Sequence, residues 1–595
     1  MSELLALQNG SDIRGIAIQT DEHDITLTDD AIQKIAQGIT LFLKQKKKLS
    51  GRIKVAIGHD SRLSAERIKL ALTEVLSSNG IEVLVAHLAT TPAMFMATQY
   101  EEINADCGIM ITASHLPYFY NGIKIFTQSG GAEKEDIRYI LEHATEKTEN
   151  TQAATVKNID LMSLYAADLV RKIREKVGTS ETPLAGSKIV VDAGNGAGGF
   201  FAKSVLAPLG ADVSASQFLE PDGHFPNHIP NPDNDEAMAS LQKAVLESKA
   251  DLGVIFDTDV DRAAIMDQNG ESLNRNALIA VISAILLKEH PETTIVTDST
   301  TSDHLRHFIE SLSGRQHRFK RGYRNVIGEA IRLNEAGIPS EIAIEVSGHA
   351  ALKENYFLDD GAYLVARILM EYAKLKADGE DLTSLIASLK QPAESMEMRL
   401  QILDDDFKPY GQKVLSDFEA FIKQTPDFEL EPNNYEGIRV QTSGKYGSGW
   451  FLLRMSLHEP VMPLNIESDT KGGIDLILTD LRPFFEGYKA SFHAMIKDVK
   501  RGGRMMRIGM IHKGCEKRRK NDADWNADIK DGFRCHSCDY SSTMDWIRIC
   551  RLSGCHYYFK CSKYEERLHA ACDSARLFNR HSVIDFGYFI SYYRI

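Results

Sequence analysis

The sequence lacks several features that mark other classes of protein. No apolar run reaches the ~20 residues needed to cross a bilayer. Residues 1–15 show neither the basic and apolar regions of a secretory signal nor the Arg- and Ser-rich lead of a transit peptide. Cysteine is almost absent from the first 500 residues, where Cys107 stands alone. We therefore expect a cytoplasmic protein without a transmembrane segment.

Positive charge is scarce over most of the chain. Residues 1–500 carry 51 Lys and Arg against 72 Asp and Glu, whereas residues 501–595 carry 18 against 11. An acidic body argues against a nucleic-acid-binding protein, because a phosphate backbone is bound by clustered basic side chains. A small anionic substrate is still compatible, since it needs only a few local cations and helix N-termini. The change near residue 500 indicates that two different kinds of polypeptide are joined there.

Short apolar strands alternate with helical patterns in the larger part of the chain. This alternation predicts an α/β fold with mostly parallel sheets that are covered on both faces. Typical domain sizes of roughly 100–200 residues suggest several domains. We expect three similar mixed α/β domains, a smaller α+β domain and an unrelated Cys-rich tail. Strands are predicted over 54–57, 81–85, 188–192, 252–256 and 294–298, and domains over 1–165, 166–285, 286–400, 401–498 and 499–595.

The first of four polar clusters contains Thr112, Ala113, Ser114 and His115, with Lys124 ten residues after the serine. Like the others, it follows an apolar strand, which is where ligands bind in parallel sheets. A serine beside a histidine offers a nucleophile and carriers for its proton, but a free serine needs help from a base or a metal. A solvated loop serine that caps a turn would give the same pattern.

The second cluster places Asp257, Asp259 and Asp261 at alternate positions after the strand 252–256, with Arg262 next. Three carboxylates can converge on one hard cation, and oxygen ligands favour Mg²⁺ or Ca²⁺ over zinc. Clustered carboxylates raise one another's pKa values unless a cation compensates. Arg262 is partial compensation and a candidate phosphate ligand. The competing interpretation is a solvated acidic turn.

Two further clusters offer polar side chains from loops. The third could hydrogen-bond sugar hydroxyls, with a glycine that permits close approach, although a structural turn would look the same. The fourth combines a cation with hydroxyls, which suits a phosphate dianion, but the pattern is weak when taken alone. The third cluster contains Glu345, Ser347 and His349, and the fourth contains Arg454, Ser456 and His458.

Taken together and in this order, the clusters resemble the α-D-phosphohexomutases, the family that includes phosphoglucomutase and phosphomannomutase. The order is that of a phosphoserine loop, a metal loop, a sugar loop and a phosphate loop. The resemblance covers about residues 7–490. Supporting segments lie at 11–15, 58–62, 191–196, 221–223 and 230–232.

The resemblance implies four domains around a central cleft and an isomerase of carbohydrate metabolism. Hexose 1-phosphate and hexose 6-phosphate would be interconverted through a phosphorylated Ser114 and a hexose 1,6-bisphosphate, with glucose 1,6-bisphosphate as activator. Mg²⁺ would be held by the Ser114 phosphate and by Asp257, Asp259 and Asp261. The family's catalytic roles fall on Arg14, Ser114, His115, Lys124 and Arg262, and its substrate-binding roles on Glu345, Ser347, His349, Arg454, Ser456 and His458.

The preferred sugar is less strongly indicated. The segment 12–15 and the sugar loop are similar to the phosphomannomutase/phosphoglucomutase branch, so glucose or mannose phosphate is expected. Phosphoglucosamine mutases usually carry Gln where Val346 stands, and they remain an alternative. A second alternative is a non-catalytic sugar-phosphate-binding protein on the same fold. The presence of Ser114, Lys124, the three aspartates and Arg262 argues against it.

The tail, residues 499–595, does not fit the family. Thiolates and imidazoles suit zinc, and Cys-x-x-Cys is a usual half-site. The alternatives are free thiols in a poorly ordered extension, a translation artefact, or a tether to a partner or a membrane surface. A disulfide knot is disfavoured in a reducing cytoplasm. The candidate zinc ligands are Cys535, Cys538, Cys561, His569 and Cys572.

Overall fold

The computed structural model describes residues 2–145, 153–178, 180–404, 406–456 and 459–488. It also describes the backbone of β23 (Phe492–Ile496), β24 (Val499–Arg501), β25 (Arg504–Met506), β26 (Trp546–Leu552) and β27 (Cys555–Lys560). The chain divides into two units at residue 511, and the antiparallel pair β26–β27 is the described part of the second. His458 and the candidate zinc ligands Cys535, Cys538, Cys561, His569 and Cys572 lie outside the described residues.

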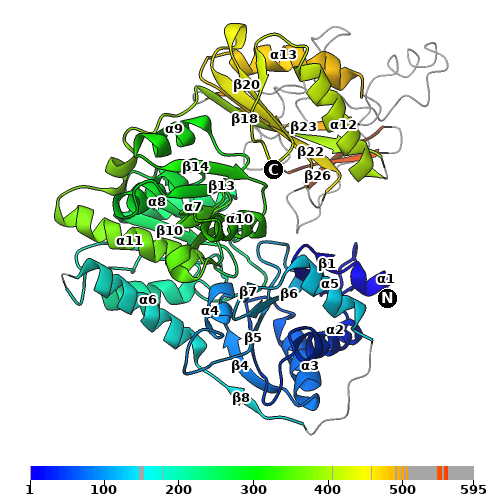
Figure 1. The fold of residues 1–595 in the computed structure, drawn as a ribbon, viewed down its shortest axis with the longest axis vertical. Coiled ribbons are helices and arrows are strands. Elements are labelled where there is room, and N and C mark those ends of the chain that lie inside the picture. Colours follow the sequence, from blue (N-terminus) through cyan, green and yellow to red (C-terminus); the bar gives the residue numbers. More distant parts are fainter. Residues whose placement is uncertain are drawn as a thin grey trace. The chain divides into compact units, whose positions relative to one another are not determined.

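The first sheet has the strand order β1-β2-β6-β5-β3-β4-β8, with β7 paired to β6 (Figure 1). Alternate side chains of a strand point to opposite faces. Val55 and Ile57 therefore join the core beneath helices α2 and α3, while Ala56 joins the core on the other face. The elements are α1 (Ser2–Leu5), β1 (Gln8–Asn9), β2 (Asp12–Ile16), α2 (Asp29–Leu41), β3 (Lys54–His59), α3 (Ala65–Ser78), β4 (Glu82–Leu88), α4 (Thr91–Met96), β5 (Cys107–Ile111), β6 (Tyr120–Thr127), β7 (Gly130–Gly131), α5 (Lys134–Glu142) and β8 (Val156–Asn158).

The second sheet has the order β12-β11-β10-β9, and the third has the order β14-β13-β15-β16-β17. Helix α11 is buried along most of its length, because its apolar residues are not confined to one face. Leu364 and Ile368 of α11 share one core with Phe201 and Phe256 of the second sheet's region. The elements are α6 (Leu161–Val177), β9 (Ile189–Asp192), α7 (Asp235–Ser248), β10 (Leu252–Phe256), β11 (Ala263–Asp267), β12 (Ser272–Leu273), α8 (Asn276–Glu289), β13 (Thr294–Asp298), α9 (Asp303–Ser311), β14 (Arg315–Phe319), α10 (Tyr323–Glu335), β15 (Ile342–Ile344), β16 (Ala350–Leu352), β17 (Leu358–Asp359) and α11 (Gly361–Ala377).

The fourth sheet is antiparallel and has the order β19-β20-β21-β22-β18-β24-β25, with β23 also paired to β18. It has a core of its own, in which Phe418 and Phe451 pack edge to face. The elements are β18 (Glu394–Ile402), α12 (Phe407–Ile422), β19 (Phe428–Leu430), β20 (Ile438–Thr442), β21 (Gly449–Leu453), β22 (Val461–Ser468) and α13 (Gly473–Glu486).

Each of the four polar clusters includes residues of a loop that joins two antiparallel neighbours, while Lys124 of the first cluster lies in β6. The loops connect β5 to β6, β10 to β11, β15 to β16 and β21 to β22. In the first three sheets the strand that enters the loop is also paired in parallel, with β3, β9 or β13. The polar residues thus lie at the carboxyl end of a parallel strand, and the chain then returns beside that strand.

The predicted α/β class is confirmed, and the strands predicted at 252–256 and 294–298 coincide with β10 and β13. The expectation of mostly parallel sheets is wrong, because each site loop returns as an antiparallel hairpin. The domain bounds of the sequence analysis stay predictions. Among the described helices, none is both long and apolar enough to span a membrane.

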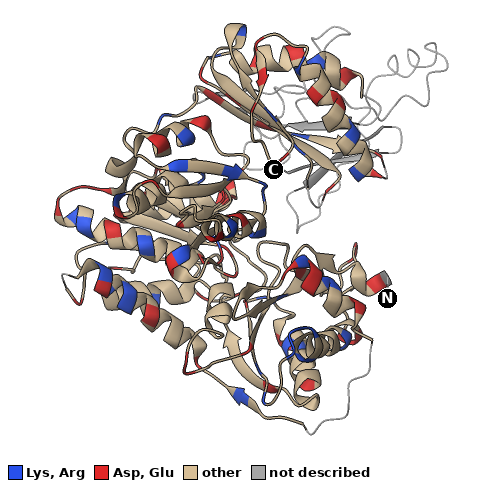
Figure 2. Ribbon diagram, in the orientation of Figure 1, with Lys and Arg blue, Asp and Glu red and all other residues tan. Residues whose placement is uncertain are grey.

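Charged residues of both signs are mixed along the helices, as along α6 (Figure 2). There the exposed Arg171 pairs with the exposed Glu175 and with the half-buried Asp168, and exposed pairs stabilise by only about 0–1 kcal/mol. Buried charge is different in kind. Asp257, Asp259 and Asp261 are each at most 1% exposed, and their surroundings form the site.

Candidate active site

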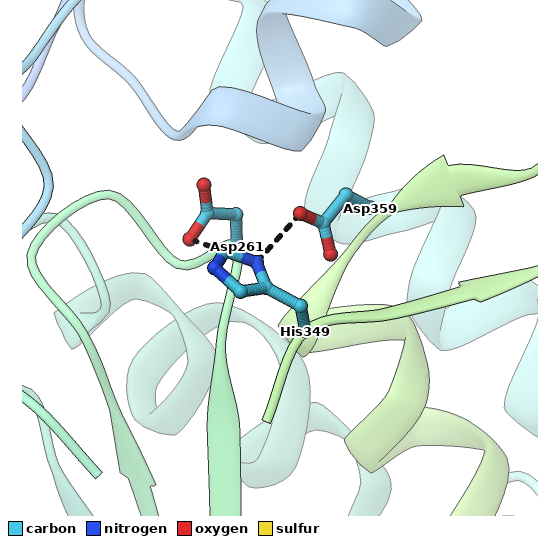
Figure 3. A group of neighbouring side chains, drawn as sticks. All are labelled: Asp261, His349 and Asp359. Carbon is cyan, nitrogen blue, oxygen red and sulfur yellow. Dashed lines mark hydrogen bonds and ion pairs between the residues drawn. The ribbon is translucent and has the colours of Figure 1, made fainter. Parts of the chain in front are cut away.

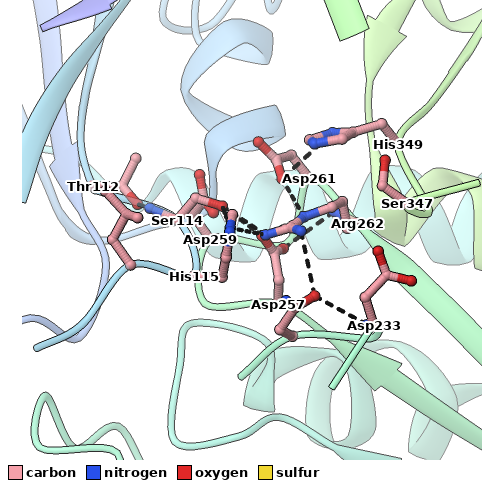
Figure 4. A network of polar contacts seen from close by, with 12 residues as sticks. Thr112, Ser114, His115, Asp233, Asp257, Asp259, Asp261, Arg262, Ser347 and His349 are labelled. Carbon is pink, nitrogen blue, oxygen red and sulfur yellow. Dashed lines mark hydrogen bonds and ion pairs between the residues drawn. The ribbon is translucent and has the colours of Figure 1, made fainter. Parts of the chain in front are cut away.

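Ser114 lies at the centre of a buried polar network (Figure 4). Its backbone has a φ of 52°, in the left-handed region that a non-glycine residue rarely adopts, and its N–H donates to Thr112 Oγ1 at 2.9 Å. The Oγ atom donates to Asp257 Oδ2 at 2.9 Å and accepts from a terminal nitrogen of Arg262 at 2.9 Å. The predicted nucleophile is therefore hydrogen-bonded to a carboxylate and a guanidinium from the second sheet's loop.

Arg62 holds the serine loop in place through hydrogen bonds to its main-chain carbonyls. One terminal nitrogen donates to the carbonyls of Pro117 and Tyr120 at 2.8 and 3.0 Å, and the other to those of Leu116, at 2.6 Å, and Ser114. The Arg62 side chain is fully buried, and its counter-ion Asp60 lies 3.3 Å away. Four carbonyl contacts from one planar guanidinium fix the loop more rigidly than a flexible ammonium group could.

The three carboxylates of the second loop lie close enough to share one cation. Asp257, Asp259 and Asp261 each offer an oxygen within 4.8 Å of the others. In Asp259 and Asp261, one buried oxygen (Oδ1) has no hydrogen-bond partner, which is costly for a buried polar atom. The Oδ1 atom of Asp261 has long ion-pair contacts of 3.8 Å to Arg262 and His349. Burial and the charge of Asp261 raise the pKa of Asp257 well above its usual range. The donor set therefore fits a hard divalent ion such as Mg²⁺.

Two cations of the chain already compensate part of this negative charge. Lys124 Nζ lies 2.9 Å from Asp259 and 2.5 Å from Asp261. Burial alone would lower the pKa of Lys124, but the two carboxylates raise it well above its ordinary value. Arg262 pairs with Asp257 at 2.9 Å. The site is thus a buried, near-neutral array in which each cation contacts a carboxylate.

His115 is an uncharged member of the array. A terminal nitrogen of Arg262 donates to His115 Nδ1 at 2.6 Å, so this nitrogen carries no proton. The adjacent guanidinium and burial together lower the pKa of His115 to about 2. The ring lies 3.4 Å from Ser114 Oγ and contributes a neutral acceptor rather than a positive charge.

Two glycines let other segments approach the metal loop. A side chain at Gly196 would meet backbone atoms of Thr258 at 2.6 Å, and one at Gly361 would meet the Arg262 carbonyl carbon at 2.7 Å. Contacts this short are excluded for any residue with a Cβ atom. The loop after β9 and the start of α11 therefore pack directly on the backbone between residues 258 and 262.

His349 brings the third loop to the same array (Figure 3). Its Nδ1 is 2.6 Å from Asp359 and 3.8 Å from Asp261. Burial alone would lower the pKa of His349, but the two carboxylates outweigh it and raise the pKa to about 9. These three residues could in principle hold a metal. The hydrogen bond to Asp359 instead places a proton on Nδ1, so His349 supplies a positive charge near Asp261.

Glu345 and Ser347 are buried in the same loop. Glu345 accepts a hydrogen bond from the Gly322 N–H at 2.6 Å, and Ser347 Oγ lies 3.4 Å from the other carboxylate oxygen. Burial and the nearby Asp298 raise the pKa of Glu345 to about 7. A carboxyl group whose pKa lies near neutral pH is typical of functional sites.

The remaining predicted residues are not hydrogen-bonded to this array. Arg14 pairs with Asp12 at 2.8 Å. Arg454 is 6% exposed and its Nε has no hydrogen-bond partner, and Ser456 Oγ accepts only from the Glu459 N–H within the described residues. The structure thus brings the first three loops together by direct contacts. The fourth loop presents a buried guanidinium that lacks a partner at Nε.

The segment Arg321-Gly322-Tyr323 contacts several site loops and was not predicted from the sequence. The Arg321 N–H donates to Glu436, the Gly322 N–H donates to Glu345, and Tyr323 contacts Ser11 through its hydroxyl and stacks on His349. The pKa of Arg454 is lowered by burial and by the charge of Arg321, so these two cations lie in one region. A glycine shortly after a strand, Gly322 after β14, was the available signal, but β14 is polar and half-buried.

Comparison with known families gives a consistent result. Three models described as phosphoglucomutase/phosphomannomutase alpha/beta/alpha domains I, II and III match residues 6–152, 167–270 and 274–392. These segments include the serine, metal and sugar loops.

Individual relatives are similar over most of their length. A phosphomannomutase/phosphoglucomutase of Pseudomonas syringae pv. tomato is 29% identical, over 75% of this chain and 87% of that protein. A phosphoglucomutase of Neisseria gonorrhoeae is 28% identical, over 80% of this chain and 95% of that protein. The crystal structure of a phosphoglucomutase/phosphomannomutase family protein from Burkholderia thailandensis has a TM-score of 0.68 at 24% identity, covering 82% of this chain and 98% of that one, and shows the same fold.

The contacts of Arg62 predict how the serine loop responds to its loss. In Arg62→Lys the charge beside Asp60 is kept, but the four carbonyls share fewer and less directed donors. Amide hydrogen exchange of residues 112–120 should become about tenfold faster, which corresponds to about 1.4 kcal/mol of lost local stability.

Arg367→Lys is the matched control for this measurement. Arg367 is also 1% exposed and ion-paired, with Glu289 and Glu354, but it does not contact the serine loop. Exchange at 112–120 should be unchanged in this variant. Equal amide exchange at residues 112–120 in Arg62→Lys and the parent protein would contradict the role of Arg62 in fixing the serine loop.

Proposed function

Because the chain belongs to the phosphoglucomutase/phosphomannomutase family, we propose that it interconverts hexose 1-phosphate and hexose 6-phosphate through a phosphorylated Ser114. It is an enzyme of the intramolecular phosphotransferase class, as the resemblance in the sequence predicted. The observation that carries the proposal is the position of Ser114 Oγ, which is 2.9 Å from both Asp257 and Arg262.

The reaction has two matched phosphoryl transfers. In the first, a free hydroxyl oxygen of the hexose phosphate attacks the phosphorus of phosphoserine. The Oγ–P bond breaks, the new O–P bond forms, and the hydroxyl proton passes to a basic group of the site, while Ser114 Oγ keeps the electron pair of the broken bond and takes up a proton from an acidic group; both proton transfers reverse in the return step. The product is a hexose 1,6-bisphosphate. In the second transfer the other phosphoryl group returns to Ser114 Oγ, and the remaining monophosphate leaves.

Arg262 supports both transfers from a fixed position. Its guanidinium contacts Ser114 Oγ, the atom on which negative charge develops when the Oγ–P bond breaks. Fixed positive charge at such an atom is the main contribution that proteins make to phosphoryl transfer. Lys124, the charged His349 and Arg14 are the proposed further cations and proton carriers, and neutral His115 is a proposed acceptor beside Ser114.

Asp257, Asp259 and Asp261 would hold Mg²⁺ together with an oxygen of the Ser114 phosphate. When bound, the ion neutralises charge on the phosphoryl oxygens. Support comes from the Oδ1 atoms of Asp259 and Asp261, which have no hydrogen-bond partner and offer single-oxygen ligands of the kind that Mg²⁺ takes. Glucose 1,6-bisphosphate is the proposed activator, since it would phosphorylate an unmodified Ser114.

Substrate recognition is assigned to the third and fourth loops. Glu345 and Ser347 would bind sugar hydroxyls, and Arg454 with Ser456 and His458 would bind the phosphate that is not being transferred. Arg321 adds positive charge on the same side. We propose glucose or mannose phosphate as substrate, with an amino-sugar phosphate as the alternative that Val346 leaves open.

A non-catalytic sugar-phosphate-binding protein is the second candidate function. It would keep Glu345 and Arg454 without requiring an array around Ser114. The buried bonds of Ser114 to the metal loop favour the enzyme instead, because a binding protein has no need to bury a serine hydroxyl between a carboxylate and a guanidinium.

The first prediction of this proposal concerns Ser114→Ala. Incubation of the purified protein with glucose 1-phosphate, Mg²⁺ and a trace of glucose 1,6-bisphosphate should give glucose 6-phosphate. Loss of the phosphate carrier should lower the rate at least about 10³-fold, because a covalent route is removed. Coupled detection of glucose 6-phosphate measures this, with mannose 1-phosphate and glucosamine 1-phosphate tested in parallel.

Ser340→Ala is the control, since Ser340 is a fully buried serine outside the array. Its activity should match that of the parent. Binding of these sugar phosphates without turnover by a folded parent protein would support the non-catalytic alternative.

A second prediction concerns pH. The carboxylate form of Glu345 accepts hydroxyl hydrogen bonds, and this form dominates only above its pKa of about 7. The value of kcat/KM should therefore rise as the pH increases through 7. Glu345→Gln should lower kcat/KM about 10- to 100-fold, the cost of about 1.4–2.7 kcal/mol of polar contacts, and should remove this rise.

The substrate phosphate also titrates, near pH 6, so a variant that keeps Glu345 is needed for comparison. Ser347→Ala serves, because it should lower kcat/KM at all pH values and leave the rise near pH 7 in place. An identical pH profile in Glu345→Gln and the parent would refute the assignment.

A further inference from the structure

Thr91 joins the first sheet's region to the metal loop. It is the first residue of α4, and its partner Asp259 lies 168 residues further along the chain. The Thr91 hydroxyl donates to Asp259 Oδ2 at 2.5 Å, and the Thr91 N–H donates to the Asp259 main-chain carbonyl at 2.9 Å. One residue therefore holds both the backbone and the carboxylate of a proposed metal ligand, and both residues are buried.

These bonds divide the two oxygens of Asp259 into different roles. Oδ2 receives Thr91 Oγ1 and also Lys124 Nζ, at 2.9 Å, whereas Oδ1 is buried and has no partner. A free carboxylate rotates about its last bond with a broad, two-fold preference, so nothing intrinsic to aspartate selects one oxygen. The hydroxyl of Thr91 fixes that rotation and leaves Oδ1 as the only unoccupied acceptor.

We propose that Thr91 is a positioning residue that holds Asp259 as a single-oxygen ligand and thereby favours Mg²⁺ over Ca²⁺. Mg²⁺ requires near-ideal octahedral geometry, usually with one oxygen from each carboxylate, whereas Ca²⁺ accepts more ligands and two-oxygen binding. The inference rests on the proposed metal site but not on the mutase reaction.

The neighbouring Thr90 shows what a purely structural threonine does here. It is also fully buried, and its hydroxyl accepts a hydrogen bond from the Ala93 N–H at 3.2 Å, which caps α4. Among the described residues, it makes no hydrogen bond to the metal loop. Thr90 and Thr91 thus differ in what they bind, although they share residue type, burial and helix end.

The test compares Thr91→Val, Thr91→Ser and Thr90→Val in the full-length protein. Mg²⁺ and Ca²⁺ dissociation constants are measured by isothermal titration calorimetry, with the phosphorylation state of Ser114 matched by intact mass. Thr91→Val should weaken Mg²⁺ binding about 10- to 100-fold, the range found when a partner of a metal ligand is removed. Its Ca²⁺ binding should weaken less, so the preference for Mg²⁺ falls.

The other variants separate positioning from general destabilisation. Thr91→Ser keeps the hydroxyl and should bind both metals within about threefold of the parent. Thr90→Val should lower the melting temperature, since an N-cap contributes about 1 kcal/mol, but it should bind both metals like the parent. Agreement with all three expectations supports the proposal.

Three results would overturn it. The first is unchanged Mg²⁺ affinity in Thr91→Val. The second is an equal loss for both metals, which would contradict the single-oxygen role. The third is an equal loss in Thr90→Val. A parent protein that binds neither metal would refute the metal site together with this inference, and the mutase assay would decide the proposed reaction separately.

Discussion

The rest of the site depends on the burial of three carboxylates within reach of one another. Removing charge from water costs several kcal/mol for each ion unless an opposite charge and hydrogen bonds compensate. Asp257, Asp259 and Asp261 are at most 1% exposed, and Lys124, Arg262 and His349 each come close to one or two of them. Because these cations come from different segments of the chain, the same electrostatic requirement that attracts a metal also holds the loops together.

Chain topology explains how loops so far apart in sequence meet. In three separate sheets a parallel strand ends in a polar loop, and the chain returns antiparallel beside it. Close packing at Gly196 and Gly361 then presses neighbouring backbone against the metal loop. Arg62, which follows β3 of the first sheet, fixes the conformation of the serine loop by donating hydrogen bonds to four of its carbonyls. The fold therefore sets the position of Ser114 before any substrate is bound, as the proposed phosphoryl transfer requires.

Features with a local signature could be predicted from the sequence. The alternation of strands and helices indicated the fold class. Polar clusters after apolar strands marked candidate loops, and their order, through the resemblance to the mutase family, assigned roles to Ser114 and the three aspartates. Features that depend on distant backbone could not be predicted. Arg62 binds main-chain carbonyls, which every residue has and no sequence pattern marks. Thr91 binds a residue 168 positions away. Arg321 and Tyr323 follow a polar strand, so the hydrophobic pattern did not mark their loop. The antiparallel returns were missed because alternating strands and helices were taken to imply parallel order throughout.

The most direct test of the central claim is to locate the metal. A crystal of the phosphorylated protein soaked in Mn²⁺, a divalent ion that also prefers oxygen ligands, would be examined by anomalous diffraction. The account predicts one strong peak about 2 Å from oxygens of Asp257, Asp259 and Asp261 and of the Ser114 phosphate. A metal peak elsewhere, and none among these three carboxylates, would contradict it.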